Sequence, residues 1–160
     1  MNSGTIVNEQ YLKGSLVILR ETFEGSPVGA SSAYLDREIG LFSTLEEVDA
    51  DHASTSVNGS TIAAHTEHLK FYVDRLREFM EGRADEVNWE QSWLIETVNE
   101  EEWSFLKQAV AKSYEQLLLS IAGVSDWDEN NIGDMVAIIA HSAYHLGAIR
   151  QIAKSVEPKR

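Results

Sequence analysis

Four long stretches of this chain carry apolar residues three or four positions apart, which is the spacing of one face of an α-helix. They lie at about residues 5–24, 62–82, 100–123 and 132–156. No stretch of convincing length shows the alternation of apolar and polar residues that is typical of a β-strand. We therefore predict an all-α fold, a four-helix bundle that forms one domain over residues 1–160.

Two long connections separate the first three predicted helices. Residues 28–57 join helices one and two, are rich in Gly, Ser and Asp, and include a predicted helical turn around 44–48. Residues 85–99 join helices two and three and contain Trp89 and Trp93 in polar surroundings. A connection as long as the first is unusual in a compact domain, and we expect it to close one end of the bundle or to cover a site.

Charge and cysteine content restrict the partners and the chemistry. The formal net charge is −13, and an acidic surface repels both nucleic acid and anionic membranes, so we expect neither as a partner. The absence of cysteine excludes disulfides and thiolate ligands, which leaves His, carboxylate and water for any metal. Residues 1–10 do not resemble a secretory signal, and the longest apolar run, Met135–Ala140, is too short to span a bilayer. We expect a cytoplasmic protein.

Four of the five histidines lie in two predicted helices. His141 and His145 are four residues apart in the last helix, so both side chains project from one face about one turn apart. The second helix carries His65, near the centre of its apolar face, and His68, at the edge of that face. The fifth, His52, lies in a polar segment that we expect to be exposed. Burying four imidazoles without partners would be costly, which favours a shared ligand.

Three neutral imidazoles around one ion leave a coordination position open, as in catalytic or ligand-binding metal sites. The bound group would be a divalent metal, with zinc or nickel as the first choices and cobalt, iron or manganese also compatible. Because ligation requires neutral imidazoles, we expect the metal to be lost as the pH falls through about 6 to 5. Periodicity alone favours His65 as the helix-two ligand because of its central position.

Two motifs resemble the DinB-like (DinB/YfiT-like) family of metalloenzymes. They are Ile62-Ala-Ala-His65-Thr-Glu-His68-Leu69 and His141-Ser-Ala-Tyr-His145-Leu-Gly-Ala-Ile-Arg-Gln-Ile, and the order of helices and connections is similar over nearly the whole chain. The resemblance implies a four-helix bundle, a homodimer, and a metal held by one histidine of helix two and two of helix four.

Transferred by motif, the implied metal ligands are His68, His141 and His145. His65 then contacts a ligand, lines the pocket, or replaces His68 as the alternative ligand. The family often has Gln at the position of Ala148, so in this chain no Gln is present there to contact a metal ligand or the substrate.

The resemblance also implies an activity. We expect a metal-dependent enzyme acting on small molecules, first a transferase that uses a low-molecular-weight thiol such as bacillithiol or mycothiol, in which the metal lowers the pKa of a coordinated thiol or water. The alternatives are a metal-dependent hydrolase and a stress-related binding module without catalysis. No catalytic residue is assigned. Tyr72 and Glu67 are candidates for polar groups of the pocket, although an exposed helix face suits Glu67 better, and Tyr144 and Arg150 are expected in structural or subunit contacts.

Overall fold

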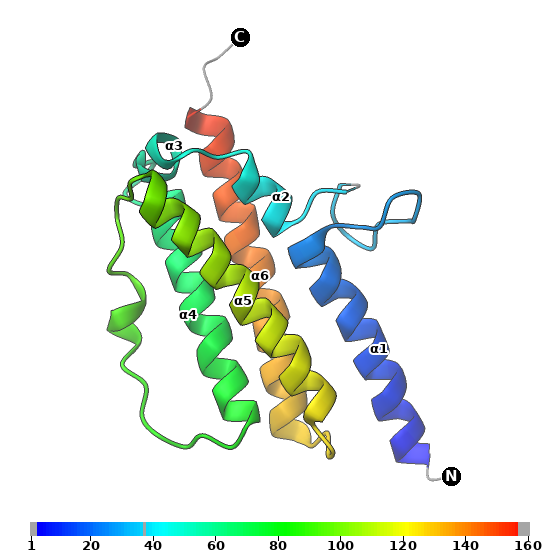
Figure 1. The fold of residues 1–160 in the computed structure, drawn as a ribbon. Coiled ribbons are helices and arrows are strands. Elements are labelled where there is room, and N and C mark those ends of the chain that lie inside the picture. Colours follow the sequence, from blue (N-terminus) through cyan, green and yellow to red (C-terminus); the bar gives the residue numbers. More distant parts are fainter. Residues whose placement is uncertain (1–2, 37, 157–160) are drawn as a thin grey trace.

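The computed structural model describes residues 3–36 and 38–156, and this part of the chain is helical without a β-strand (Figure 1). Four long helices dominate it. The elements are α1 (Ser3–Glu24), α2 (Leu41–Glu46), α3 (Ala50–Ser54), α4 (Ile62–Met80), the 3-10 turn η1 (Trp89–Ser92), α5 (Glu100–Gly123) and α6 (Glu129–Val156). The predicted all-α class is therefore confirmed.

Side chains before α4 and α5 explain where these two helices begin. Thr61 Oγ1 accepts a hydrogen bond from the backbone N–H of Ala64 at 3.1 Å. At α5, Asn99 and Glu102 cap each other: each side chain accepts from the other residue's backbone N–H, both at 2.9 Å. These bonds satisfy N–H groups that have no acceptor within the helix. Local sequence thus determines the start of both helices.

Helix α6 begins at Glu129, three residues before the predicted start at Ile132. Asp128 provides the reason, because its carboxylate accepts the backbone N–H of Asn131 at 2.9 Å. By length and mean hydropathy alone α6 could cross a membrane, but the core helix of a soluble protein passes the same test, so this is weak support for a membrane span.

The first connection contains more helix than the single turn predicted at 44–48. Its two short helices, α2 and α3, pack against the long helices. The indole Nε1 of buried Trp103 donates to the carbonyl oxygen of Val48 at 2.7 Å, so α5 holds this connection in place.

Packing of the long helices centres on α4, which contacts both α5 and α6, while α1 contacts α6 and α2. Phe23 of α1 also stacks on Tyr114 of α5, with ring centroids 4.6 Å apart. Each fully buried Leu or Ile stabilises the fold by about 1.5–3 kcal/mol relative to exposure. The largest fully buried side chains are Trp103, Phe23, Leu19, Leu41, Leu45, Ile62, Leu69, Leu117, Met135, Ile138, Leu146 and Ile149.

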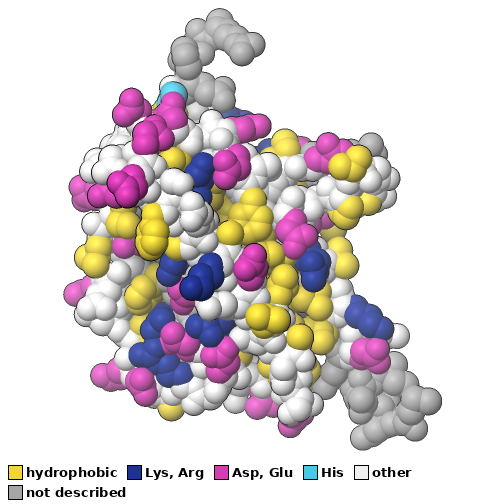
Figure 2. Space-filling model, in the orientation of Figure 1, with side chains coloured by type: hydrophobic (Ala, Val, Ile, Leu, Met, Phe, Trp, Pro, Cys, Tyr) yellow, Lys and Arg dark blue, Asp and Glu magenta, His cyan; other side chains and the backbone are white. Residues whose placement is uncertain are grey.

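Acidic side chains are spread over the face drawn in Figure 2, with basic side chains among them. Two arginines of α4 are paired with glutamates: Arg75 bonds to Glu78 at 2.5 Å, and Arg77 bonds to Glu81 at 2.8 Å. The partners in each pair are three or four residues apart, so they are neighbours on the helix surface.

Candidate metal centre

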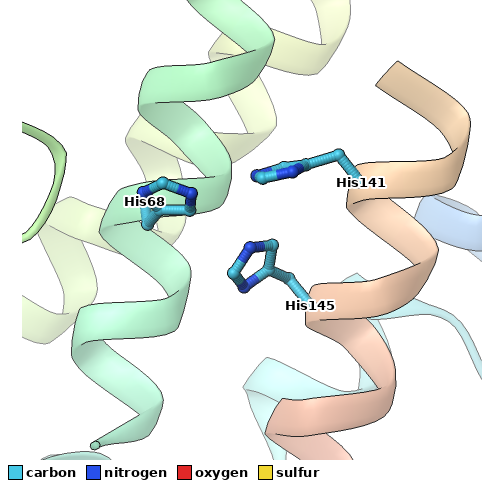
Figure 3. Close-up of side chains that lie close together, drawn as sticks. All are labelled: His68, His141 and His145. Atoms are coloured by element: carbon cyan, nitrogen blue, oxygen red, sulfur yellow. The ribbon is translucent and has the colours of Figure 1, made fainter. Parts of the chain in front are cut away.

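The histidines of α4 and α6 meet where these two helices pack against each other. His141 and His145 lie one turn apart on the face of α6 that meets α4, and Figure 3 shows their rings and that of His68 pointing into the space between the helices. One nitrogen from each of the three lies within 4.8 Å of the other two. The described residues add no carboxylate to this group. The structure therefore brings together the three residues that the resemblance implies.

An aromatic side chain contacts each of the three imidazoles. Trp93 stacks on His68 with ring centroids 4.2 Å apart, and Tyr72 stacks on His141 at 3.6 Å. Tyr144 meets His145 edge-on at 5.0 Å. These rings displace water from part of each imidazole, although Trp93 and Tyr144 are themselves 44% and 68% exposed. The cluster is thus enclosed by apolar surfaces on several sides.

Burial keeps the histidines neutral. Desolvation lowers the pKa of His145 to about 3 and that of His141 to about 4, and the neighbouring histidines lower both further in the same direction. The pKa values of His65 and His68 are also lowered by desolvation, and hydrogen bonding to the backbone of Ser92 opposes this shift at His68. A neutral imidazole is the form that binds a metal ion, so the cluster is ready to ligate near neutral pH.

Hydrogen bonds engage one nitrogen on two of the three rings. His145 Nδ1 lies 2.8 Å from His65 Nδ1, and His68 Nδ1 lies 2.8 Å from the hydroxyl of Ser92. His141 Nε2 is buried and has no hydrogen-bond partner within the described part of the chain. A buried nitrogen left without a partner costs about 1–3 kcal/mol, and a ligand would remove that cost.

The residues present fit a divalent ion. Metal–nitrogen distances of about 2.0–2.1 Å place two ligand nitrogens of a tetrahedral ion about 3.3 Å apart. The nitrogens lie within 4.8 Å of one another, so a small inward movement of the rings suffices. Three imidazoles suit zinc, nickel or cobalt better than calcium or magnesium.

The other candidates from the sequence are dispersed around the cluster. His65 lies beside it and contacts His145. Glu67 differs from an exposed helix-face residue, because its half-buried carboxylate accepts the backbone N–H groups of Leu94 and Ile95 at 2.8 and 2.7 Å.

Three further candidates have structural contacts. Tyr72 stacks on His141, and burial raises its pKa. Arg150 pairs with Asp36 at 2.6 Å, which ties α6 to the first connection. His52 lies away from the cluster in α3 and bonds to Asp49.

Sequence reasoning missed Ser92 and Trp93. Trp93 contacts His68, and its ring centroid lies 5.5 Å from that of His65 and 5.9 Å from that of His145. The signal in the sequence was weak: two tryptophans in a polar connection, without the periodicity that identifies a buried face. Only the packing of the connection against α4 shows that it belongs to the site.

Trp93 also forms part of a cavity wall. A cavity of about 300 Å³ is bounded by the indole together with Ala64, Thr61, Glu96 and neighbouring hydroxyl residues. The indole therefore has contacts with the histidines and also lines a space large enough for a small molecule.

Comparison with known proteins finds no family model, no curated protein and no solved structure that matches this chain.

Proposed function

We propose that this protein is a divalent-metal-dependent enzyme of the DinB-like type, in which α1, α4, α5 and α6 form the four-helix bundle. One observation carries the proposal: three buried or half-buried neutral imidazoles converge from two helices, and one of their nitrogens is buried without a partner among residues 3–36 and 38–156. Structural histidines usually satisfy their nitrogens with protein groups or water. A shared ion accounts for the convergence and for the unpaired nitrogen together.

In the proposed site His68, His141 and His145 hold the ion, with zinc or nickel preferred. When bound, the ion supplies Lewis-acid chemistry, lowering the pKa of a thiol or water that occupies its open position. The protein's own residues hold the rings of this centre and partly shield them from water. The contact with His65 orients the ring of His145, and Tyr72 and Trp93 fix the planes of two ligand rings.

The substrate in this proposal is a small molecule that approaches beside Trp93. The cavity that this indole lines is also bordered by Ser54, Ser60, Thr61 and Glu96. A thiol-dependent transfer is the first candidate reaction and a hydrolysis is the alternative. The position of Trp93 also favours a second function, a metal-binding module without turnover, because the indole limits access to the ligands.

Metal titration of the tag-free protein tests the site. We expect one Zn²⁺ per chain, and we expect His68→Ala, His141→Ala or His145→Ala to abolish tight binding. His65→Ala should weaken binding by about 10- to 100-fold, the usual effect of removing a group that orients a ligand. His52→Ala is the matched control, since His52 lies in α3 away from the cluster and bonds to Asp49, and it should leave binding unchanged.

The same titration can also contradict the proposed site or its assigned ligands. Less than about half an equivalent of metal after supplementation would overturn the metal site. If His65→Ala abolished binding and His68→Ala did not, His65 would be the helix-two ligand.

Turnover distinguishes the enzyme from the binding module. The zinc- or nickel-loaded protein would be screened with low-molecular-weight thiols and a panel of electrophiles, and separately with ester and amide substrates. Turnover that disappears in folded His145→Ala supports the enzyme. Metal and substrate binding without turnover in either screen supports the binding module.

A further inference from the structure

Ser92 is the last residue of η1, and it connects the second long connection to the histidine cluster. Its side chain is fully buried. The hydroxyl makes two hydrogen bonds: it donates to the carbonyl oxygen of Trp89 at 2.6 Å, and it lies 2.8 Å from Nδ1 of His68. Ser92 is thus joined both to its own turn and to a candidate metal ligand on α4.

Counting protons determines the direction of the second bond. A serine hydroxyl has one proton, and a carbonyl oxygen can only accept, so that proton points to Trp89. The hydroxyl must therefore accept in its bond with His68, and Nδ1 of His68 must carry a proton. A neutral imidazole has a single N–H. The remaining nitrogen, Nε2, then carries the lone pair that a metal requires.

The other two histidines of the cluster lack this kind of control. His145 Nδ1 faces another imidazole nitrogen, and either ring can donate in that contact. His141 is held by stacking on Tyr72. Within the cluster, His68 is the ring whose tautomer is determined by a hydroxyl, that of Ser92, which acts as the acceptor.

Neighbouring residues hold Ser92 in position. Trp93 follows it and stacks on the ring of His68 with an interplanar angle of 17°. The carboxylate of Glu67, adjacent to His68 on α4, then accepts the N–H groups of Leu94 and Ile95. Four consecutive residues of the connection are therefore attached to one turn of α4 around His68.

We propose that Ser92 is a positioning residue that fixes His68 as its Nδ1–H tautomer, with Nε2 as the ligand atom, and so makes metal affinity dependent on the connection at residues 89–95. The effect on affinity rests on the proposed function, whereas the tautomer of His68 in the metal-free protein does not. Ser92 acts through His68 and has no assigned contact with a substrate.

Imidazole ¹⁵N chemical shifts in the metal-free protein at pH 7.5 test the tautomer. In the wild-type protein His68 should be protonated on Nδ1, and in Ser92→Ala it should shift to a mixture of both tautomers. The matched control is Ser142→Ala, which removes another fully buried hydroxyl, one without a hydrogen-bond partner among the described residues. It should leave the His68 signals unchanged. A wild-type His68 protonated on Nε2 would overturn the proposal without any variant, even if Ser92→Ala failed to fold.

Zinc affinity, measured by competition with a chelator, tests the consequence. Ser92→Ala should bind Zn²⁺ about 10- to 100-fold more weakly than the wild type, and Ser142→Ala should bind within twofold of it. If the wild type binds zinc and Ser92→Ala binds equally well, the positioning role is wrong while the metal site stands. If the wild type binds no zinc, the proposed function fails, and the tautomer result still decides the role of Ser92.

Discussion

The two long connections of this protein are attached to the preceding helix in the same way but differ in what else they contact. In the first, Glu21 of α1 accepts the backbone N–H groups of Ala33, Tyr34 and Leu35. In the second, Glu67 of α4 accepts two backbone N–H groups, and the same segment also reaches the histidines. The first attachment serves the fold, and the second serves both the fold and the candidate site.

The two glutamates, Glu21 and Glu67, differ in how deeply they are buried. Glu21 is only 4% exposed, and its three hydrogen bonds lower its pKa against the opposing effect of desolvation. Glu67 is half-buried, so water can reach part of its carboxylate. When a fully buried carboxylate is removed, water can take over few of its hydrogen bonds. When a half-buried carboxylate is removed, water can take over more of them. We therefore expect mutations at the two positions to affect stability and metal binding differently.

The largest effect on stability is expected from Glu21→Ala. The substitution removes the buried acceptor of three backbone N–H groups. Each hydrogen bond to a charged group has a net contribution of about 1.5–3 kcal/mol. Water can replace part of this loss, because Ala33 and Tyr34 are exposed. We expect the free energy of unfolding in urea, followed by circular dichroism, to fall by about 3 kcal/mol. Zinc affinity of the folded variant should stay within twofold of wild type. A loss below about 1 kcal/mol would contradict the role assigned to Glu21.

Glu67→Ala should have the opposite pattern: a smaller loss of stability and a larger loss of zinc affinity than Glu21→Ala. Water should replace part of the lost hydrogen bonding, so the free energy of unfolding should fall by about 1 kcal/mol. Zinc affinity should fall several-fold, because Ser92 and Trp93 lose their support. Unchanged zinc affinity in Glu67→Ala, or a larger effect on zinc in Glu21→Ala, would remove the distinction between the two connections.

Acid should affect the two regions in different pH ranges. The histidine pKa values are lowered in the folded protein, so between about pH 6.5 and 4 the unfolded chain binds protons that the folded metal-free protein does not. The free energy of unfolding should therefore decrease as the pH falls through this range. Glu21, whose pKa is also lowered, contributes stability that is lost only below its unfolded value of 4.5.

Denaturant titrations at a series of pH values measure this difference. Folded His145→Ala should show a shallower decrease between pH 6.5 and 4 than wild type. An equal slope in the two proteins would show that His145 is not buried in its neutral form. The same lowered pKa values shift the expected loss of metal to a lower pH than the range of about 6 to 5 inferred from sequence, because these imidazoles bind protons weakly.

Periodicity and caps were sufficient to predict the long helices. The apolar spacing predicted a helix at about residues 100–123, and α5 spans Glu100–Gly123. The start of α6 was predicted three residues late because Asp128, not an apolar residue, determines it. Between the two short helices of the first connection, Val48 is bonded to Trp103 of α5, a distant contact that a local pattern does not contain.

The site was predictable where its residues share a helix. The four-residue spacing of His141 and His145 determines their common face in any α-helix. Spacing alone favoured His65, which lies near the centre of the apolar face, whereas the resemblance implied His68 at the edge of that face. The choice between them depends on how α4 is rotated against α6, which places His68 in the group of three and His65 next to His145. Ser92 and Trp93 come from a connection, where sequence offers no periodicity.

X-ray absorption at the zinc edge of the zinc-loaded protein tests the central claim directly, namely that His68, His141 and His145 hold one divalent ion. We predict nitrogen or oxygen ligands at about 2.0–2.1 Å, with the outer-shell scattering of three imidazoles, decreasing to two imidazoles in any sample of His68→Ala that still holds zinc. A zinc environment with one imidazole or none, or three imidazoles unchanged by His68→Ala, would contradict the claim.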